Sequence, residues 1–84
     1  MHHVYVLRSE KNFEKIYIGI TNNIERRLGE HNGDSNGYTK RYSPWKLTVL
    51  ISFENEQLAK DFEKYLKSGS GFAFLRKRLI SKRV

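Results

Sequence analysis

The sequence predicts an α+β fold, in which a small three-stranded antiparallel sheet is flanked by helices in the order β-β-α-β-α-α. Two patterns predict it: short stretches of alternating apolar and polar residues, typical of strands, and longer stretches with apolar residues at helical spacing. The expected strands are residues 4–7, 15–21 and 45–53, and the expected helices are residues 24–31, 56–67 and 72–82. With 84 residues and no visible repeat, we expect a single domain over 1–84.

The first two strands are expected to form a hairpin across a polar connection. If they pair symmetrically about Asn12, Tyr5 lies opposite Gly19. Leu7 then lies opposite Tyr17, and both tyrosines point to the same face of the sheet. Because Gly19 has no side chain, we expect space above it where a ligand could approach the backbone.

The second strand runs directly into the first helix, which begins at a pair of asparagines, residues that cap helices well. From Ile24 onward, helical spacing gives one stripe, made of Ile24, Arg27, Leu28 and His31. A helix that only packed against the sheet would carry apolar residues at all four positions. Arginine and histidine on a rigid element beside a sheet are instead suited to binding a phosphate.

The segments after this helix have weaker patterns. Residues 33–37, which are rich in turn-forming residues, are expected to form a loop, and residues 38–42 are expected to be either a short helical turn or irregular. Trp45 opens the third strand, so we expect it in the core rather than against a nucleic acid.

Two helices are expected in the C-terminal third of the chain. Asn55 caps the first of them, and Gly69 and Gly71 are expected to end it. The broad apolar face of the first helix comprises Leu58, Ala59, Phe62, Tyr65 and Leu66, and the buried residues of the second are Phe72, Leu75 and Leu79.

The charge distribution suggests a polyanionic partner. The net charge is +7, and no acidic residue follows Glu63 whereas seven basic residues do. Nucleic acid is the first candidate for such a partner, although a charged, solvated surface would give the same pattern. The candidate contacts to nucleic acid are Lys40 and Arg41, which lie among aromatic residues, and Arg76, Lys77 and Arg78 near the C-terminus.

The composition also excludes several classes of protein. The chain has no cysteine, which excludes a disulfide framework and zinc sites built on thiolates. Its longest apolar stretch is far too short to cross a bilayer, and no apolar run of a signal peptide follows the first histidines. We therefore expect a cytoplasmic protein that does not contact a membrane.

Five short motifs or single residues occur in a definite order along the chain, which is a stronger signal than any one of them alone. They are His3-Val4-Tyr5, Tyr17-Ile18-Gly19, Arg27, His31 and Glu63. From about Val4 to about Leu79, the chain resembles a small single-domain member of the GIY-YIG nuclease superfamily. It departs from the family at the first motif, where His3 replaces glycine, and it lacks the asparagine that some members carry after the metal-binding glutamate.

The resemblance implies an endonuclease that hydrolyses phosphodiester bonds with one divalent metal ion, Mg²⁺ or Mn²⁺. DNA is the expected substrate ahead of RNA, and it is expected to be recognised by structure rather than sequence. Since the chain has no spare segment for reading base edges, tight site selection would need a homodimer or a protein partner.

The resemblance also implies roles for the motif residues. Tyr5, Tyr17 and Arg27 correspond to active-site residues, Glu63 corresponds to the metal ligand, and His31 matches a position that lines the site. Tyr5 is the leading general base by resemblance. A phenol with a pKa of about 10 is a poor base at neutral pH, but a cation such as Arg27 nearby would favour the phenolate. His31 is the alternative base because its ordinary pKa lies near neutral pH.

Each of these residues also has an ordinary structural explanation. Both tyrosines could be strand aromatics, Arg27 could pair with Glu30 or Glu25, and Glu63 could pair with Lys67 one turn along its helix. The alternatives to an enzyme are a catalytically weak nucleic-acid-binding module and a basic RNA-binding or ribosome-associated protein.

Overall fold

The computed structural model of the chain describes residues 1–33 and 38–81. The strands are β1 (His2–Ser9), β2 (Ile16–Thr21) and β3 (Trp45–Phe53), and the helices are α1 (Ile24–Asn32), α2 (Tyr38–Arg41), α3 (Glu56–Leu66), α4 (Gly69–Phe74) and the short π-helix η1 (Leu75–Leu79). This order confirms the predicted α+β fold. In the described part of the chain, no helix is both long and apolar enough to cross a membrane.

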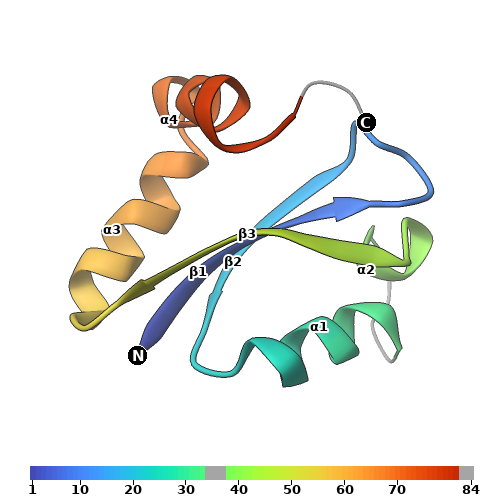
Figure 1. The fold of residues 1–84 in the computed structure, drawn as a ribbon, viewed down its shortest axis with the longest axis horizontal. Coiled ribbons are helices and arrows are strands. Elements are labelled where there is room, and N and C mark those ends of the chain that lie inside the picture. Colours follow the sequence, from blue (N-terminus) through green and yellow to red (C-terminus); the bar gives the residue numbers. More distant parts are fainter. Residues whose placement is uncertain (34–37, 82–84) are drawn as a thin grey trace.

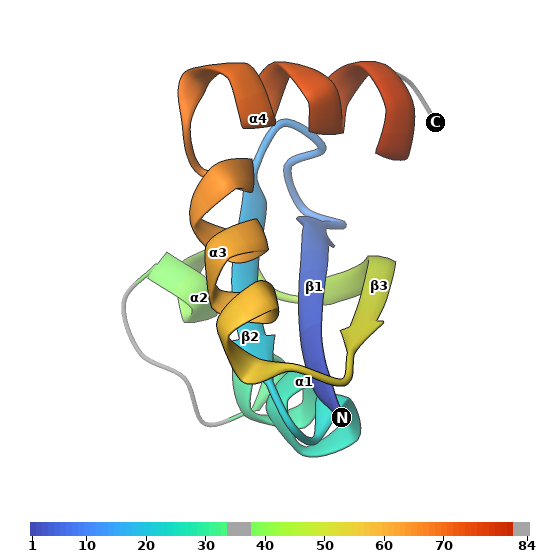
Figure 2. The same ribbon diagram turned by 90° about the vertical axis from the view of Figure 1, so that its left-hand side faces the viewer.

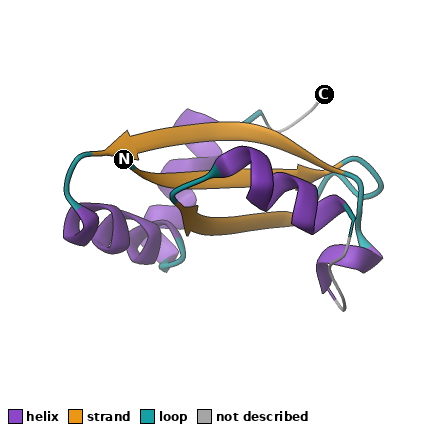
Figure 3. Ribbon diagram, turned by 90° about the horizontal axis from the view of Figure 1, so that it is seen from below, coloured by secondary structure: helices purple, strands orange, loops and turns teal. Residues whose placement is uncertain are grey.

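The three strands form one antiparallel sheet with β1 in the centre, in the order β2-β1-β3. Helices cover both faces: α1 and α2 lie on one side of the sheet, and α3 and α4 lie on the other (Figures 1 and 3). The predicted register is confirmed, since Tyr5 pairs with Gly19 and Leu7 pairs with Tyr17. Both tyrosines therefore point to the α1 side of the sheet.

The central strand supplies side chains to two separate cores. Val4 and Val6 are buried on the α3 side, where they pack with Leu66 and Leu75. Tyr5 and Leu7 are buried on the α1 side, where they pack with Trp45, which is in the core as expected. The central part of β1 thus has no solvent-facing side, and each residue from Val4 to Leu7 belongs to one core or the other.

The start of α4 differs from the sequence prediction. Gly69 and Gly71 do not end α3, which finishes at Leu66; they belong to α4. The Ser68 hydroxyl caps α4 by accepting a hydrogen bond of 3.2 Å from the Gly71 amide. Gly71 lies so close to the backbone carbonyl of Tyr65 that a side chain there would clash with it. The glycine is needed for this close packing between helices, which a sequence pattern cannot distinguish from helix termination.

The predicted last helix, residues 72–82, also differs in detail. The helical segment begins three residues earlier, becomes π-helical at Leu75 and ends at Leu79. Figure 2 shows α4 and the segment after it lying across the end of the sheet where β1 finishes. Leu75 is fully buried there, as predicted, whereas Phe72 and Leu79 are partly buried.

The apolar face predicted for α3 is too broad. Ala59 and Leu66 are buried and Phe62 packs at the edge of the core, but the Leu58 and Tyr65 side chains are exposed. The Tyr65 ring instead contacts the rings of Phe62 and Phe74 at the surface. A three-stranded sheet is too narrow to cover the whole apolar stripe of this helix.

Residues 38–41 form the short helix α2, one of the two possibilities left open by the sequence. Of the predicted loop over 33–37, residues 34–37 lie outside the described residues.

Gly19 does not leave open space above the sheet, contrary to the sequence prediction. The phenol ring of Tyr5, from the neighbouring strand, lies directly over Gly19, and a side chain at this position would clash with that ring. Glycine at this position therefore makes room for Tyr5 rather than for a ligand.

We predict that Gly19→Ala destabilises the protein by about 1–3 kcal/mol, because the added methyl group must displace the buried Tyr5 ring. Chemical denaturation followed by circular dichroism measures this change. Gly29→Ala is the matched control, because Gly29 lies in α1 with open space around it. That substitution should raise the free energy of unfolding by about 0.5–1 kcal/mol. Equal stability of the Gly19→Ala variant and the wild type would contradict the packing argument.

Candidate active site

Four predicted site residues meet on the α1 side of the sheet. The Tyr5 and Tyr17 rings, from β1 and β2, stack at an angle of 21° with their centroids 6.3 Å apart. From α1, His31 brings its ring to 4.5 Å from the ring of Tyr17 and its Nε2 atom to 3.1 Å from the Tyr5 hydroxyl. Arg27 Nε donates a hydrogen bond of 3.3 Å to the same hydroxyl. We call these four residues the tyrosine cluster.

The local sequence explains why α1 can place two side chains over one phenol. The Asn23 side chain accepts a hydrogen bond of 3.1 Å from the Arg26 amide, which fixes the start of the helix directly after β2. Arg27 and His31 are four residues apart, so they lie one above the other on the same side of the helix. Ile24 and Leu28 from the same stripe pack against the core of this face.

Burial decides the protonation state of Tyr5. The side chain is 1% exposed, and this burial raises the pKa of the Tyr5 phenol above its ordinary value of 10. The hydrogen bond and the positive charge of Arg27 act in the opposite direction but are outweighed. Arg27 therefore does favour the phenolate, as expected, but too weakly to overcome the effect of burial. Tyr5 is a neutral phenol at neutral pH.

His31 is neutral for the same reason. Burial lowers the pKa of its imidazole below the ordinary value of 6.5, and the neighbouring Arg27 cation lowers it further. Its Nδ1 atom is buried and has no hydrogen-bond partner among the described residues. Since Arg27 Nε donates to the Tyr5 oxygen, the O–H of Tyr5 is free to donate to Nε2 of a neutral His31.

Arg27 connects the buried cluster to solvent. Its Nη1 atom forms an ion pair of 3.1 Å with Glu30, as one of the structural explanations expected, and both side chains are 41% exposed. Such an exposed pair contributes little to stability and can exchange for another anion. The hydrogen bond to Tyr5 is the main cause that raises the pKa of Arg27, so the guanidinium remains charged beside the cluster.

Glu63 is not part of the tyrosine cluster, because it lies on α3. α3 packs on the opposite face of the sheet, where the Glu63 carboxylate forms an ion pair of 2.9 Å with Lys67, the ordinary pairing expected for it. Lys67, Tyr17 and Phe72 all line a hollow of about 320 Å³ at the edge strand β2. Burial is the main cause of the raised pKa of Tyr5, but the negative charge of Glu63 adds to it, so this charge reaches the cluster.

The residues present fit a metal bound through one carboxylate. The described residues contain no group of three or more His, Cys, Asp or Glu that could hold a metal ion together. A Mg²⁺ ion commonly binds one or two carboxylates and takes its remaining ligands from water and substrate phosphates. Glu63, whose side chain is 21% exposed, can offer one such ligand if Lys67 moves away.

The predicted nucleic-acid contacts fall into two groups. Lys40 and Arg41 are exposed on α2, on the same side of the sheet as the tyrosine cluster. Arg76, Lys77 and Arg78 belong to η1 on the other side, where Arg76 stacks on Phe72 at 5.9 Å and the other two are exposed.

One supporting residue, Asn32, was not found from the sequence. Asn32, at the end of α1, donates a hydrogen bond of 3.1 Å to the Trp45 carbonyl and accepts one from the Trp45 amide, which ties α1 to β3. The Trp45 ring in turn meets the Tyr17 ring edge-on at 6.3 Å. An asparagine at a helix end usually indicates a cap, so its sequence position gave no sign of this contact. His3, which replaces the glycine of the first motif, bonds to Ser52 Oγ on β3 at 2.6 Å.

Comparison with known proteins identifies relatives of two kinds. The chain is 46% identical over 65 residues to the structure-specific endonuclease subunit SLX1 of Phaeosphaeria nodorum, covering 70% of this chain and 18% of the relative. It is 38% identical over 71 residues to SLX1 of Debaryomyces hansenii, covering 76% of this chain and 20% of the relative. The chain thus spans a fifth or less of the length of these SLX1 proteins.

The second kind of relative is small. The chain is 40% identical over 68 residues to the UPF0213 protein CPE1444 of Clostridium perfringens, covering 80% of this chain and 71% of the relative. In addition, residues 1–77 match the family described as the GIY-YIG catalytic domain. Because this match spans nearly the whole chain and includes all five motif positions, the chain belongs to the GIY-YIG family.

Proposed function

We propose that this protein is an endonuclease that hydrolyses phosphodiester bonds in DNA, with the help of one divalent metal ion, and selects its substrate by structure. The observation that carries the proposal is the Tyr5 phenol held between the Arg27 cation and a neutral His31. Membership of a family described as a catalytic domain supports it, as do relatives named structure-specific endonuclease subunits.

The cluster can activate water without ionising Tyr5. The Tyr5 oxygen accepts a proton from the attacking water while the phenol passes its own proton to His31 Nε2. The water oxygen forms the new bond to phosphorus, and the bond from phosphorus to the leaving oxygen breaks. This relay gives Tyr5 and His31 joint roles and avoids the phenolate that burial disfavours.

Arg27 is the group that binds the scissile phosphate. It is already positioned by Tyr5, and its exposed portion can release Glu30 and bind phosphate oxygens instead. Tyr17 is a positioning residue whose ring lies against both His31 and Tyr5. A Mg²⁺ or Mn²⁺ ion held by Glu63 would neutralise charge on the phosphate and on the leaving oxygen.

A catalytically weak nucleic-acid-binding module is the second candidate. The ion pair between Glu63 and Lys67 favours it, because that pair occupies the one carboxylate assigned to the metal. The SLX1 relatives are named as subunits, which supports our proposal that a partner protein or self-association supplies site selection.

We predict that Tyr5→Phe and Arg27→Ala each lower the rate of cleavage of branched or flapped DNA by about 10²–10⁴-fold, because each removes a part of the proton relay or the phosphate contact. Gel assays with Mg²⁺ or Mn²⁺ measure the rate, and fluorescence anisotropy checks that binding is retained. Arg26→Ala is the matched control, since Arg26 pairs with the same Glu30 but does not reach Tyr5. Intact DNA under every metal and substrate tried, with folded protein, would favour the binding module.

The pH dependence should report the buried His31. The neutral imidazole accepts the proton, so cleavage should fall as the pH drops through a pKa that burial holds below about 6.5. As the pH falls, the imidazole takes up a proton at a higher pH in the unfolded chain than in the folded protein. The free energy of unfolding should therefore also decrease as the pH falls below about 6.5. Both dependences should weaken in His31→Gln, as measured by pH–rate profiles and by denaturation. An acid limb at or above pH 6.5 would remove His31 from this role.

We predict opposite effects on metal binding at the two ends of the Glu63–Lys67 pair. Glu63→Ala should abolish Mn²⁺ binding measured by electron paramagnetic resonance. Lys67→Ala should tighten it about two- to fivefold, because an exposed ion pair is worth about 0.2–1 kcal/mol. Lys60→Ala is the control, since Lys60 forms the equivalent pair with Glu56 on the same helix. Unchanged Mn²⁺ affinity in Glu63→Ala would exclude Glu63 as the ligand.

A further inference from the structure

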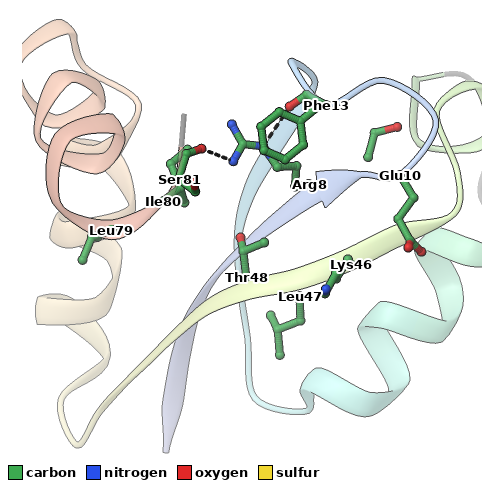
Figure 4. Close-up of a pocket in the computed structure, with 10 residues that line it drawn as sticks. Arg8, Glu10, Phe13, Lys46, Leu47, Thr48, Leu79, Ile80 and Ser81 are labelled. Atoms are coloured by element: carbon green, nitrogen blue, oxygen red, sulfur yellow. Dashed lines mark hydrogen bonds between the residues drawn. The ribbon is translucent and has the colours of Figure 1, made fainter. Parts of the chain in front are cut away.

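A second cavity, of about 560 Å³, lies between the end of β1, the start of β3 and the segment that leaves η1 (Figure 4). Arg8 lies at its centre, and the lining includes Phe13, Lys46, Ile80 and Ser81. Arg8 pairs with Ile16 across the β1–β2 ladder, and Ile16 belongs to the core on the α3 side. The Arg8 side chain is therefore on the opposite face of the sheet from the tyrosine cluster.

Arg8 is a buried cation without an anionic partner among the residues that the structure describes. The residue is 6% exposed, its Nε donates a hydrogen bond of 2.8 Å to the Phe13 carbonyl, and its Nη1 donates to the Ser81 carbonyl. The guanidinium lies 3.6 Å from the centre of the Phe13 ring. No carboxylate among the described residues forms an ion pair with it. A buried charge is normally neutralised, since leaving it unpaired is costly.

Other positive charges surround this arginine. Lys46 is its direct partner across the β1–β3 ladder, so two like charges face each other where such pairs are destabilising. Burial is the main cause that lowers the pKa of Arg8, and the charge of Arg76 lowers it further. Glu10 also lines the cavity but pairs with none of these cations in the described part of the chain. Among the described residues, the cations Arg8, Lys46 and Arg76 and the carboxylate of Glu10 give this region a net charge of +2.

We propose that this cavity binds the terminal phosphate of a nucleotide, with the sugar and base against its apolar lining. A phosphate monoester carries a charge of about −1.5 to −2 near pH 7, which matches the local excess of positive charge. The hydrogen bonds that Arg8 makes among the described residues use Nε and Nη1, so its Nη2 group can donate to a phosphate oxygen. Phe13, Leu79 and Ile80 supply an apolar wall, and the volume is in the range of small-ligand sites. The site is separate from the proposed hydrolysis, since it lies on the other face of the sheet.

The test is an NMR titration of the ¹⁵N-labelled full chain with deoxyadenosine 5′-monophosphate. We expect saturable shifts at the amides of Arg8, Lys46 and Ser81, and no such shifts with deoxyadenosine. Lys46→Glu should weaken binding by roughly tenfold, because it turns one of the cations into an anion. Lys46 is exposed, so this change leaves intact the hydrogen bonds by which Arg8 joins Phe13 to Ser81.

Lys60→Glu is the matched control, because it makes the same change of charge at an exposed position on α3 and should alter affinity by less than about twofold. Equal weakening in both variants would indicate diffuse attraction and overturn the proposal. Equal affinity for inorganic phosphate would overturn the assignment to a nucleotide. Shifts confined to the tyrosine cluster, or none with any probe, would also overturn it. DNA cleavage measured separately distinguishes these failures from failure of the proposed hydrolysis.

Discussion

The pairing of β1 with β2 is the constraint on which the candidate active site depends. It sets Tyr5 beside Gly19, and the missing side chain of that glycine lets the phenol lie flat over the neighbouring strand. The same register turns Tyr17 to the same face, so that the two rings stack. α1 follows β2 without a long connection, and its side chains therefore arrive over the Tyr5 hydroxyl. A slip of one residue would send one tyrosine to the opposite core.

Burial and charge act against each other within this arrangement. Burial keeps both Tyr5 and His31 uncharged, and Arg27 opposes burial at the phenol but reinforces it at the imidazole. The outcome is a neutral donor and a neutral acceptor in one hydrogen bond next to a permanent cation. Pairs of titratable groups whose pKa values are pushed apart by their surroundings are a common basis for dividing acid and base roles.

The sequence carried enough information to predict the fold and the spatial grouping of four of the five motif residues. Strand alternation fixed the faces of β1 and β2, and helical spacing put Arg27 and His31 on one side of α1, because both patterns depend on local geometry alone. The position of Glu63 depends on how α3 crosses the sheet, which no local pattern encodes. The same limit explains why Leu58 was expected in the core, and why the packing role of Gly71 was taken for helix termination.

The Arg8 cavity shows a further limit of reasoning from sequence. Arg8 lies near the end of β1 and Lys46 near the start of β3, so each taken alone suggests an ordinary surface cation. Their pairing across the ladder, and the approach of Arg76 from η1, become visible after the strands and the last helix are placed. The periodicity of the sequence therefore cannot predict polar sites that are built from distant segments. It can predict sites whose residues come from a strand and the helix that directly follows it.

The alternation of β1 between two cores has a consequence for engineering this fold. Tyr5 and Leu7, at odd-numbered positions, belong to the core beside α1, while Val4 and Val6, at even-numbered positions, pack against α3 and the helical segment after it. Substitutions at Val4 and Val6 could therefore alter thermal stability without replacing a residue of the tyrosine cluster. The tyrosine cluster and the larger apolar core thus lie on opposite sides of a single strand, so the two can be varied separately.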